Sequence, residues 1–124
     1  MSQILIIDDD LASCRTLEVH LGSQGHQVRV AHSFEAGLAA ARANPPELVI
    51  LDFRMPGMSG LEGLPVLRHE FPAVRVVMIT AYHERDVVRQ AKEHGADACL
   101  AKPLDINELD GAMENALHRT GFSA

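Results

Sequence analysis

The sequence predicts an α/β domain in which short buried strands alternate with amphipathic helices. Apolar runs of strand length recur at a regular interval, and each is followed by a segment whose apolar residues recur at helical spacing. This alternation is typical of repeated strand–helix units over a parallel sheet. About five such units fit the chain, with apolar runs at residues 4–7, 28–30, 48–51, 76–79 and 98–101.

The five runs differ in pattern, and the differences predict their order in the sheet. The first, third and fourth are apolar throughout, as strands covered on both faces must be. The segment HQVRVA at 26–31 alternates, and ACLA at 98–101 is weaker, so both suit edge strands. With right-handed crossovers, these assignments predict a doubly wound five-stranded parallel sheet of order 2-1-3-4-5, a flavodoxin-like three-layer sandwich.

The expected helices have recognisable ends. Cys14, Leu17 and Leu21 share one helix face, and Gly25 can terminate that helix. Pro65 lies within the third helical segment and removes a backbone donor, so we expect that helix to start late or to kink. Ser33 can cap the second helix, and the third is marked by Leu61, Leu64 and Leu67. The fourth is marked by Val87, Val88 and Ala91 before Gly95, and the fifth begins with the capping-box-like pair Asp105 and Glu108.

Composition excludes several classes of protein. The formal net charge is −6, with acids spread along the chain, which disfavours a nucleic-acid or anionic-membrane surface. Cys14 and Cys99 show no metal or disulfide spacing, which indicates a reducing cytoplasm. The sequence lacks a signal peptide and a membrane-length apolar segment. We expect one soluble, cytoplasmic domain over residues 1–124, with its core at about 3–120, and a downstream output domain beyond Ala124 remains open.

Polar side chains follow the predicted strands where each strand ends. In a doubly wound sheet these ends border the ligand crevice, which brings together Asp8, Asp9, Asp52, Thr80 and Lys102. Two carboxylates roughly 5 Å apart in a medium of effective dielectric 20 repel each other by on the order of 3 kcal/mol. A shared proton could relieve this repulsion and would suit acid–base catalysis. Clustered oxygens without His or Cys ligands favour Mg²⁺ instead, which we predict here.

A cation beside a carboxylate and a lysine indicates phosphoryl transfer. Asp52 could serve as the nucleophile and form an aspartyl phosphate. Lys102 would add positive charge at the phosphoryl group, and the Thr80 hydroxyl could donate to one of its oxygens. Alone, Thr80 would be an ordinary strand-end hydroxyl and Lys102 a solvated amine. Their coincidence at one sheet edge supports the site, whereas Asp10 is assigned as the cap of the first helix.

The segments IIDDD, LDFRMPGMSG, ITAY and AKPLDINEL together resemble the receiver domain of two-component response regulators, which is CheY-like, across essentially the whole chain. The resemblance implies that Asp52 accepts a phosphoryl group from a sensor histidine kinase or phosphotransfer protein in a Mg²⁺-dependent phosphorelay. It implies that Asp9 binds Mg²⁺ directly, that Asp8 acts largely through water, and that the backbone carbonyl of Arg54 is a further ligand.

The resemblance also assigns the switch. Thr80 matches the switch hydroxyl and Lys102 the family's lysine, whose bond to Pro103 is expected to be cis. The position of the family's aromatic switch residue holds Cys99, so we expect the readout through the loop after the fourth strand and the fourth helix, with Tyr82 a candidate replacement ring. Details such as TAY and KPLDINEL look most like receivers preceding sigma-54-dependent activators. Homodimerisation through the fourth-helix face remains open.

Three alternative functions fit the sequence less well. A phosphatase of the haloacid-dehalogenase type would use Asp8 as nucleophile and Asp10 as acid–base, but no later acidic pair completes that site. Flavin binding would need a phosphate loop where this chain has acids. A pseudo-receiver that works only through its fourth and fifth helices would not need the set Asp8, Asp9, Asp52, Thr80 and Lys102. We therefore predict a signalling phosphoacceptor that catalyses only its own phosphorylation and dephosphorylation, and not a conventional enzyme.

Overall fold

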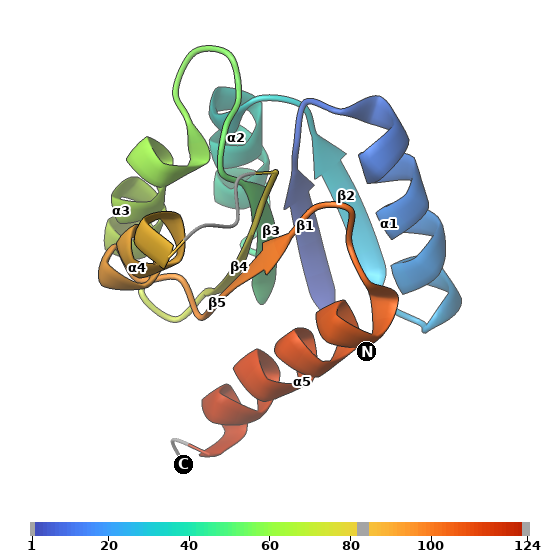
Figure 1. Ribbon diagram of the computed structural model, residues 1–124. Helices are drawn as coiled ribbons and strands as arrows, with labels where there is room; N and C mark the ends of the chain where they lie inside the picture. The colour runs from blue at the N-terminus through green and yellow to red at the C-terminus, as the bar shows by residue number, and fades with distance from the viewer. Residues whose placement is uncertain (1, 82–84, 123–124) are drawn as a thin grey trace.

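The computed structural model describes residues 2–81 and 85–122 and contains one five-stranded sheet (Figure 1). All neighbouring strands are parallel, and their order is β2-β1-β3-β4-β5. This confirms the predicted order, including the two edge strands. The strands are β1 (Gln3–Ile7), β2 (Gln27–Ala31), β3 (Leu48–Asp52), β4 (Arg75–Thr80) and β5 (Ala98–Ala101).

Helices cover both faces of the sheet and form the outer layers of a sandwich (Figure 1). Successive residues of the central strands point to opposite faces, so Ile4 and Ile6 join one core cluster and Leu5 and Ile7 join the other. The first cluster packs against α1 (Leu11–Ser23) and α5 (Ile106–Phe122). The second packs against α2 (Phe34–Ala43), α3 (Gly60–Glu70) and α4 (Arg85–Glu93).

The helix ends largely follow the predicted caps. The Asp10 carboxylate accepts from the backbone N–H groups of Ala12 and Ser13 at the start of α1. Asp105 does the same for residues at the start of α5, where its Oδ1 lies 2.8 Å from the amide nitrogen of Asn107. Gly25 follows α1 with a φ of +90°, a backbone conformation that glycine adopts without strain.

Of the two effects predicted for Pro65, the late start of the third helix is wrong, and a kink stays a prediction. Helix α3 begins at Gly60 and contains Pro65. Its start is fixed by a capping box, in which the Ser59 hydroxyl accepts from the Glu62 amide and the Glu62 carboxylate accepts from the Ser59 amide. A proline removes only one hydrogen bond of the helix ladder, and this reciprocal cap with the buried Leu64 offsets that loss.

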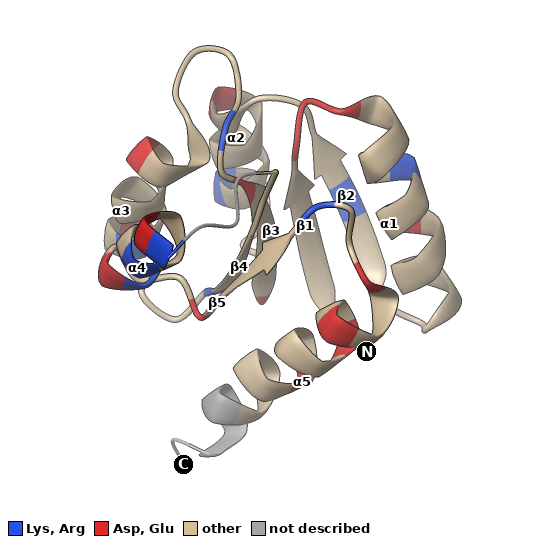
Figure 2. Cartoon of the chain, viewed as in Figure 1, with Lys and Arg blue, Asp and Glu red and all other residues tan. Residues whose placement is uncertain are grey.

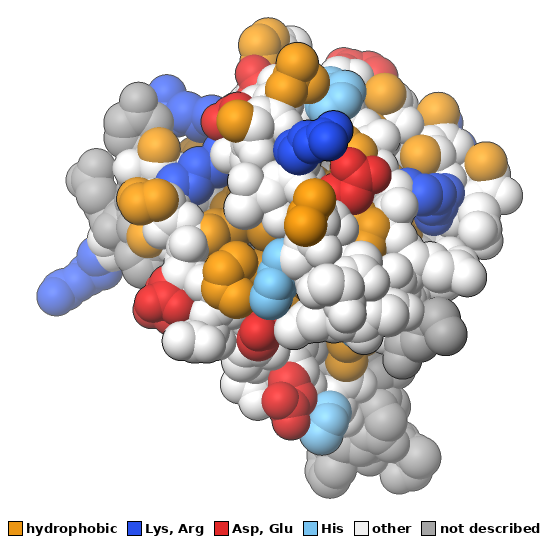
Figure 3. All heavy atoms as spheres, turned by 90° about the vertical axis from the view of Figure 1, so that its right-hand side faces the viewer, with side chains coloured by type: hydrophobic (Ala, Val, Ile, Leu, Met, Phe, Trp, Pro, Cys, Tyr) orange, Lys and Arg blue, Asp and Glu red, His pale blue; other side chains and the backbone are white. Residues whose placement is uncertain are grey.

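The surface carries charges of both signs. On the side of the molecule that carries α1, acidic, basic and hydrophobic side chains are interspersed (Figure 3). Leu11 and Val19 of α1 are exposed, at 66% and 64%. Among the helices that the structure describes, none is long and apolar enough to cross a membrane.

Candidate phosphoacceptor site

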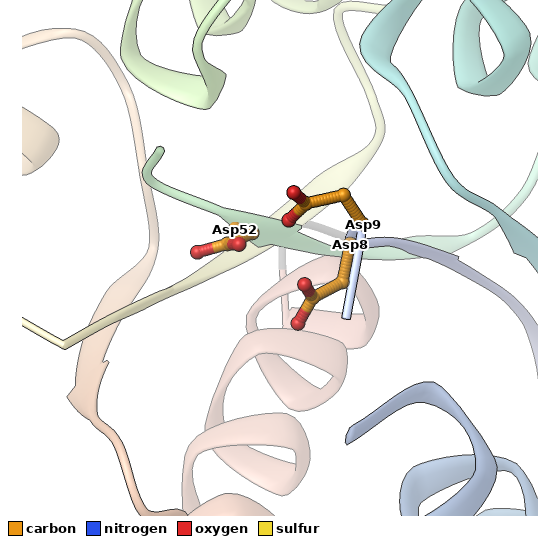
Figure 4. A group of neighbouring side chains, drawn as sticks. All are labelled: Asp8, Asp9 and Asp52. Carbon is orange, nitrogen blue, oxygen red and sulfur yellow. The ribbon is translucent and has the colours of Figure 1, made fainter. Parts of the chain in front are cut away.

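Three carboxylates meet at the carboxyl ends of β1 and β3. These strands are neighbours, with Ile7 paired to Leu51, so the residues that follow them lie at one edge of the sheet. One oxygen each from Asp8, Asp9 and Asp52 lies within 4.8 Å of the others. Figure 4 shows the three side chains gathered at this edge, and Figure 2 shows the acidic segment that leads from β1 into α1.

Lys102 brings the positive charge to this cluster. Its Nζ lies 3.2 Å from Oδ2 of Asp8 and 3.4 Å from Oδ2 of Asp52. The lysine follows β5, and its backbone N–H donates to the carbonyl of Thr80 across a distance of 2.8 Å. Thr80 itself ends β4 and is buried. The structure therefore brings together the five residues that the strand ends predicted.

Asp8 is fully buried and incompletely satisfied. Its Oδ1 accepts from the backbone N–H of Asp10 at 2.9 Å. Within the described ranges, no donor is aligned for a hydrogen bond to its Oδ2, although Lys102 Nζ lies at ion-pair distance. A buried carboxylate oxygen without a hydrogen bond is costly, so this atom is available to an additional cation or to its water ligands.

The buried site changes the acidity of its groups. Burial, followed by the negative charge of Asp8, raises the pKa of Asp52 from 3.8 to about 7, although Lys102 opposes this. Burial lowers the pKa of Lys102, but the attraction of Asp52 and Asp8 outweighs it, so this pKa lies above its ordinary value. One lysine thus remains charged but does not fully compensate the acids around it.

The ligand chemistry of the cluster fits a hard divalent cation. Asp8, Asp9 and Asp52 offer carboxylate oxygens, and among the described residues this is the one group of His, Cys, Asp or Glu close enough to hold a metal ion. Oxygen ligands without thiolate or imidazole suit Mg²⁺. The oxygen of Asp8 that lacks a hydrogen bond and the raised pKa of Asp52 both indicate a deficit of positive charge that such a cation would remove.

The backbone around Asp52 is tightly held. Gly60 begins α3 so close to this residue that a Cβ at position 60 would lie 1.9 Å from the carbonyl oxygen of Asp52. Only glycine allows this approach. The Phe53 amide donates to the Ile79 carbonyl at 2.8 Å, and the Gly60 amide donates to the Phe53 carbonyl at 3.0 Å. Asp52 is therefore fixed on both sides, by β4 and by the start of α3.

Other predicted residues have different outcomes. Arg54 lies exposed in the loop after β3, and the ligand role of its carbonyl stays a prediction. The Lys102–Pro103 bond is cis, as the resemblance implies. Cys99 is buried on β5 opposite Met78, as expected of a small strand residue. Tyr82 and the loop histidine His83 lie outside the described residues.

Two contacts at the site were not anticipated. The Cys14 thiol donates to the backbone carbonyl of Asp8 at 3.2 Å, and Nδ1 of His32 lies 3.2 Å from the same oxygen. Cys14 is buried as its helix face predicted, and burial with the charge of Asp8 raises its pKa to about 11, so it remains a thiol at neutral pH. Side-chain patterns do not reveal which carbonyl such a residue faces, and the sequence offers no other signal for this pair.

A groove of about 540 Å³ lies beside Lys102. It runs between the start of α1 and the segment between β5 and α5, and apolar residues of both segments line it, including Leu17, Pro103, Leu104 and Ile106. The site is thus bordered by a mainly apolar surface.

Comparison with known proteins shows which family has sequences like this one. Residues 4–114 match the family model described as the response regulator receiver domain. The transcriptional regulatory protein ZraR of Escherichia coli is 35% identical over 117 residues, which cover 94% of this chain and 26% of ZraR. The sporulation initiation phosphotransferase F of Bacillus subtilis is 35% identical over 115 residues, with 93% of each chain covered.

Solved structures agree with the sequence comparison. A response regulator receiver domain protein (CheY-like) from Methanospirillum hungatei superposes with a TM-score of 0.93 at 27% identity, covering 100% of this chain and 99% of that one. The chain spans about a quarter of the length of the ZraR relatives and nearly the full length of the sporulation phosphotransferase.

Proposed function

The chain belongs to the family of response regulator receiver domains, and from this premise we propose that Asp52 accepts a phosphoryl group from a sensor histidine kinase or a phosphotransfer protein. The observation that carries the proposal is the position of Asp52, buried at the strand ends, 3.4 Å from Lys102 and within one acidic cluster with Asp8 and Asp9. No rival reading uses all of these groups.

The reaction requires an ionised Asp52. One of its carboxylate oxygens attacks the phosphorus of a phosphohistidine, a phosphorus–oxygen bond forms and the phosphorus–nitrogen bond breaks. The electron pair stays on the imidazole ring, which leaves as neutral imidazole when its other nitrogen carries a proton. Lys102 favours the ionised form of Asp52 and can hold a phosphoryl oxygen, and Thr80 can donate to another.

Asp9, Asp52 and the Arg54 carbonyl would hold Mg²⁺ directly, and Asp8 would act largely through water. When bound, Mg²⁺ supplies positive charge to the phosphoryl oxygens. The same charge would lower the raised pKa of Asp52 and prepare it for attack at neutral pH.

Hydrolysis of the acyl phosphate would reset the domain. Water attacks phosphorus, the bond to the Asp52 oxygen breaks, and inorganic phosphate leaves. Arg54 in the adjoining loop, together with Tyr82, is proposed to tune the access of this water. The domain thus acts as a phosphoacceptor switch that catalyses only its own phosphorylation and dephosphorylation.

The proposed switch draws Thr80 toward the phosphoryl group and remodels the surface around α4 and β5. It shifts an existing equilibrium between inactive and active states. Because Cys99 is smaller than the aromatic residue that the family places there, the readout is proposed to depend mainly on the loop after β4 and on α4.

Phosphodonor and output partners complete the proposal. The apolar groove beside Lys102 offers a surface on which a phosphodonor protein could dock next to Asp52. We place residues 1–124 in one receiver domain of a cytoplasmic signalling protein; an output domain after Ala124 would match the longer ZraR relatives, and a stand-alone receiver would match the sporulation phosphotransferase. Dimerisation through the face of α4 is compatible with this arrangement.

Incubation with Mg²⁺ and a small phosphodonor tests the assignment, with intact-protein mass spectrometry as readout. We expect about one phosphoryl group per chain on the unmodified protein and none on Asp52→Asn. Asp86→Asn, an exposed change on α4, is the matched control and should be phosphorylated normally. Normal phosphorylation of Asp52→Asn would refute the assignment. Many turnovers that depend on Asp8 would indicate a phosphatase, and no phosphorylation at all would indicate a pseudo-receiver.

A further inference from the structure

The backbone carbonyl of Asp8 occupies a special place in the site. It belongs to the planar peptide unit that joins Asp8 to Asp9, so its direction constrains the backbone of both acids. The Asp8 amide still donates to the Ala31 carbonyl at 3.0 Å, but β2 ends at Ala31. Asp8 is fully buried, and a buried carbonyl needs hydrogen-bond donors.

Two side chains from different elements supply those donors. The Cys14 thiol, from α1, and Nδ1 of His32, from the turn after β2, each lie 3.2 Å from this oxygen. They lie 3.9 Å from each other, so both can approach the same oxygen, which has two lone pairs. A carbonyl can only accept, so the hydrogen bond to Asp8 forms in the tautomer of His32 that carries its ring proton on Nδ1. Helix α1 and strand β2 are thereby tied to the peptide that carries the acids.

We propose that Cys14 and His32 are positioning residues that hold the Asp8–Asp9 peptide so that both carboxylates face Asp52. The inference rests on the metal site of the proposed function. Outer groups that orient metal-binding residues commonly contribute to metal affinity without touching the ion. Neither side chain has a reactive role in this scheme.

The first test needs no metal. In the metal-free, isotope-labelled full chain, the ¹⁵N shifts of His32 should show the Nδ1–H tautomer, and the Asp8 carbonyl ¹³C shift should move when either donor is removed. An Nε2–H tautomer for His32, or an Asp8 carbonyl shift that is unchanged in Cys14→Ala and His32→Ala, would overturn the proposal.

The second test is titration with magnesium chloride, followed by backbone amide shifts. The double variant Cys14→Ala/His32→Ala should bind Mg²⁺ about tenfold more weakly than the unmodified chain. Each single variant should lose about threefold, because one donor remains. The conservative double variant Cys14→Ser/His32→Asn keeps both donors and should return to within about twofold of the original affinity.

Controls separate positioning from general loss of stability. Cys99→Ala/His94→Ala removes the same residue types elsewhere, since Cys99 lies in the opposite core cluster and His94 contacts only the carbonyl of Gln90 among the hydrogen bonds described. It should leave Mg²⁺ affinity unchanged. Thermal unfolding of every variant then shows whether a loss of Mg²⁺ affinity accompanies removal of the donors alone or a general loss of folding stability.

Failure of the proposed metal site and failure of the positioning role give different results. If the unmodified chain shows no Mg²⁺-dependent shifts, the proposed metal site fails and the positioning role fails with it. If the unmodified chain binds Mg²⁺ and the alanine double variant binds equally well, only the positioning role is wrong. A conservative variant as weak as the alanine variant would also contradict it, because the donors would then not be the cause.

Discussion

The sheet edge at the starts of the strands and the sheet edge at their carboxyl ends both bury charged side chains, but only the first balances their charge. At the edge where β4 and β5 begin, Asp97 has a side chain that is only 5% exposed, and its charge is well matched. Its Oδ2 accepts from the Val76 amide at 2.8 Å and from Arg68 Nη2 at 3.0 Å, and Arg75 lies 3.9 Å from Oδ1. Arg68 also donates to the carbonyl of Gly95. This cluster joins α3 to the strand starts.

At the opposite edge, acids outnumber the cation. Asp8 and Asp52 are both buried and share the single amine of Lys102, and one oxygen of Asp8 has no hydrogen bond from a described residue. The comparison teaches that buried charge in this fold is matched where it serves only stability. The unmatched edge stores unfavourable energy that a bound cation can relieve.

The largest effect is expected from breaking the matched cluster. Arg68→Ala leaves Asp97 buried with only the more distant Arg75, and should lower the free energy of unfolding by about 3 kcal/mol. Chemical denaturation measures this. The control Arg42→Ala breaks the exposed pair with Glu70 and should lower the free energy of unfolding far less, because solvent screens that pair. Equal losses in the two variants would show that the buried cluster is not special.

The unmatched edge should respond in the opposite direction. Asp52→Asn removes a repelled charge and should raise the free energy of unfolding at pH 8 by on the order of 2 kcal/mol. The pKa of Asp52 is raised to about 7 in the folded state, so the folded form holds this proton more tightly than the unfolded form does.

The sign of the pH dependence follows from this. The unmodified chain should lose stability relative to Asp52→Asn as pH rises from about 4 to about 7, and the difference should then stay constant. Denaturation of both proteins across this range checks the curve. A constant difference between the two at every pH would show that Asp52 has an ordinary pKa.

Magnesium should give the smallest of these effects. At ten times its dissociation constant, Mg²⁺ should stabilise the folded chain by about 1.4 kcal/mol. Asp9→Asn removes one carboxylate of the cluster with little effect on packing, since Asp9 is exposed, and should reduce this gain. Thermal unfolding with magnesium chloride, at matched ionic strength, is the measurement. The same stabilisation of both proteins would indicate a general salt effect.

Much of this arrangement could be predicted from residues alone, for physical reasons. The apolar runs at 4–7, 48–51 and 76–79 require cover on both faces, and this placed the alternating run at 28–30 on an edge. Once the order was set, parallel strands had to bring Asp8, Asp52 and the residues after β4 and β5 to one edge.

The unpredicted features depend on directions that no local pattern encodes. Arg68 lies on α3 and Asp97 lies 29 positions later, just before β5, so the two meet only in the folded chain. Cys14 was correctly placed in the core, but the carbonyl that its thiol faces depends on how α1 packs on the sheet. Pro65 was expected to delay or kink α3, whereas the cap at Ser59 sets the start of this helix.

The close approach of Gly60 to Asp52 has a consequence for engineering. The hydrogen bond between the Gly60 amide and the Phe53 carbonyl joins the two ends of the intervening segment and closes it into a loop. The exposed residues of this segment, such as Arg54, Pro56 and Met58, can therefore be exchanged to test their effect on the lifetime of the proposed acyl phosphate, provided that Phe53, Gly60, the buried Met55 and the Ser59 cap are kept. Randomised libraries that include position 60 would mostly contain chains in which a side chain at this position prevents α3 from packing next to Asp52.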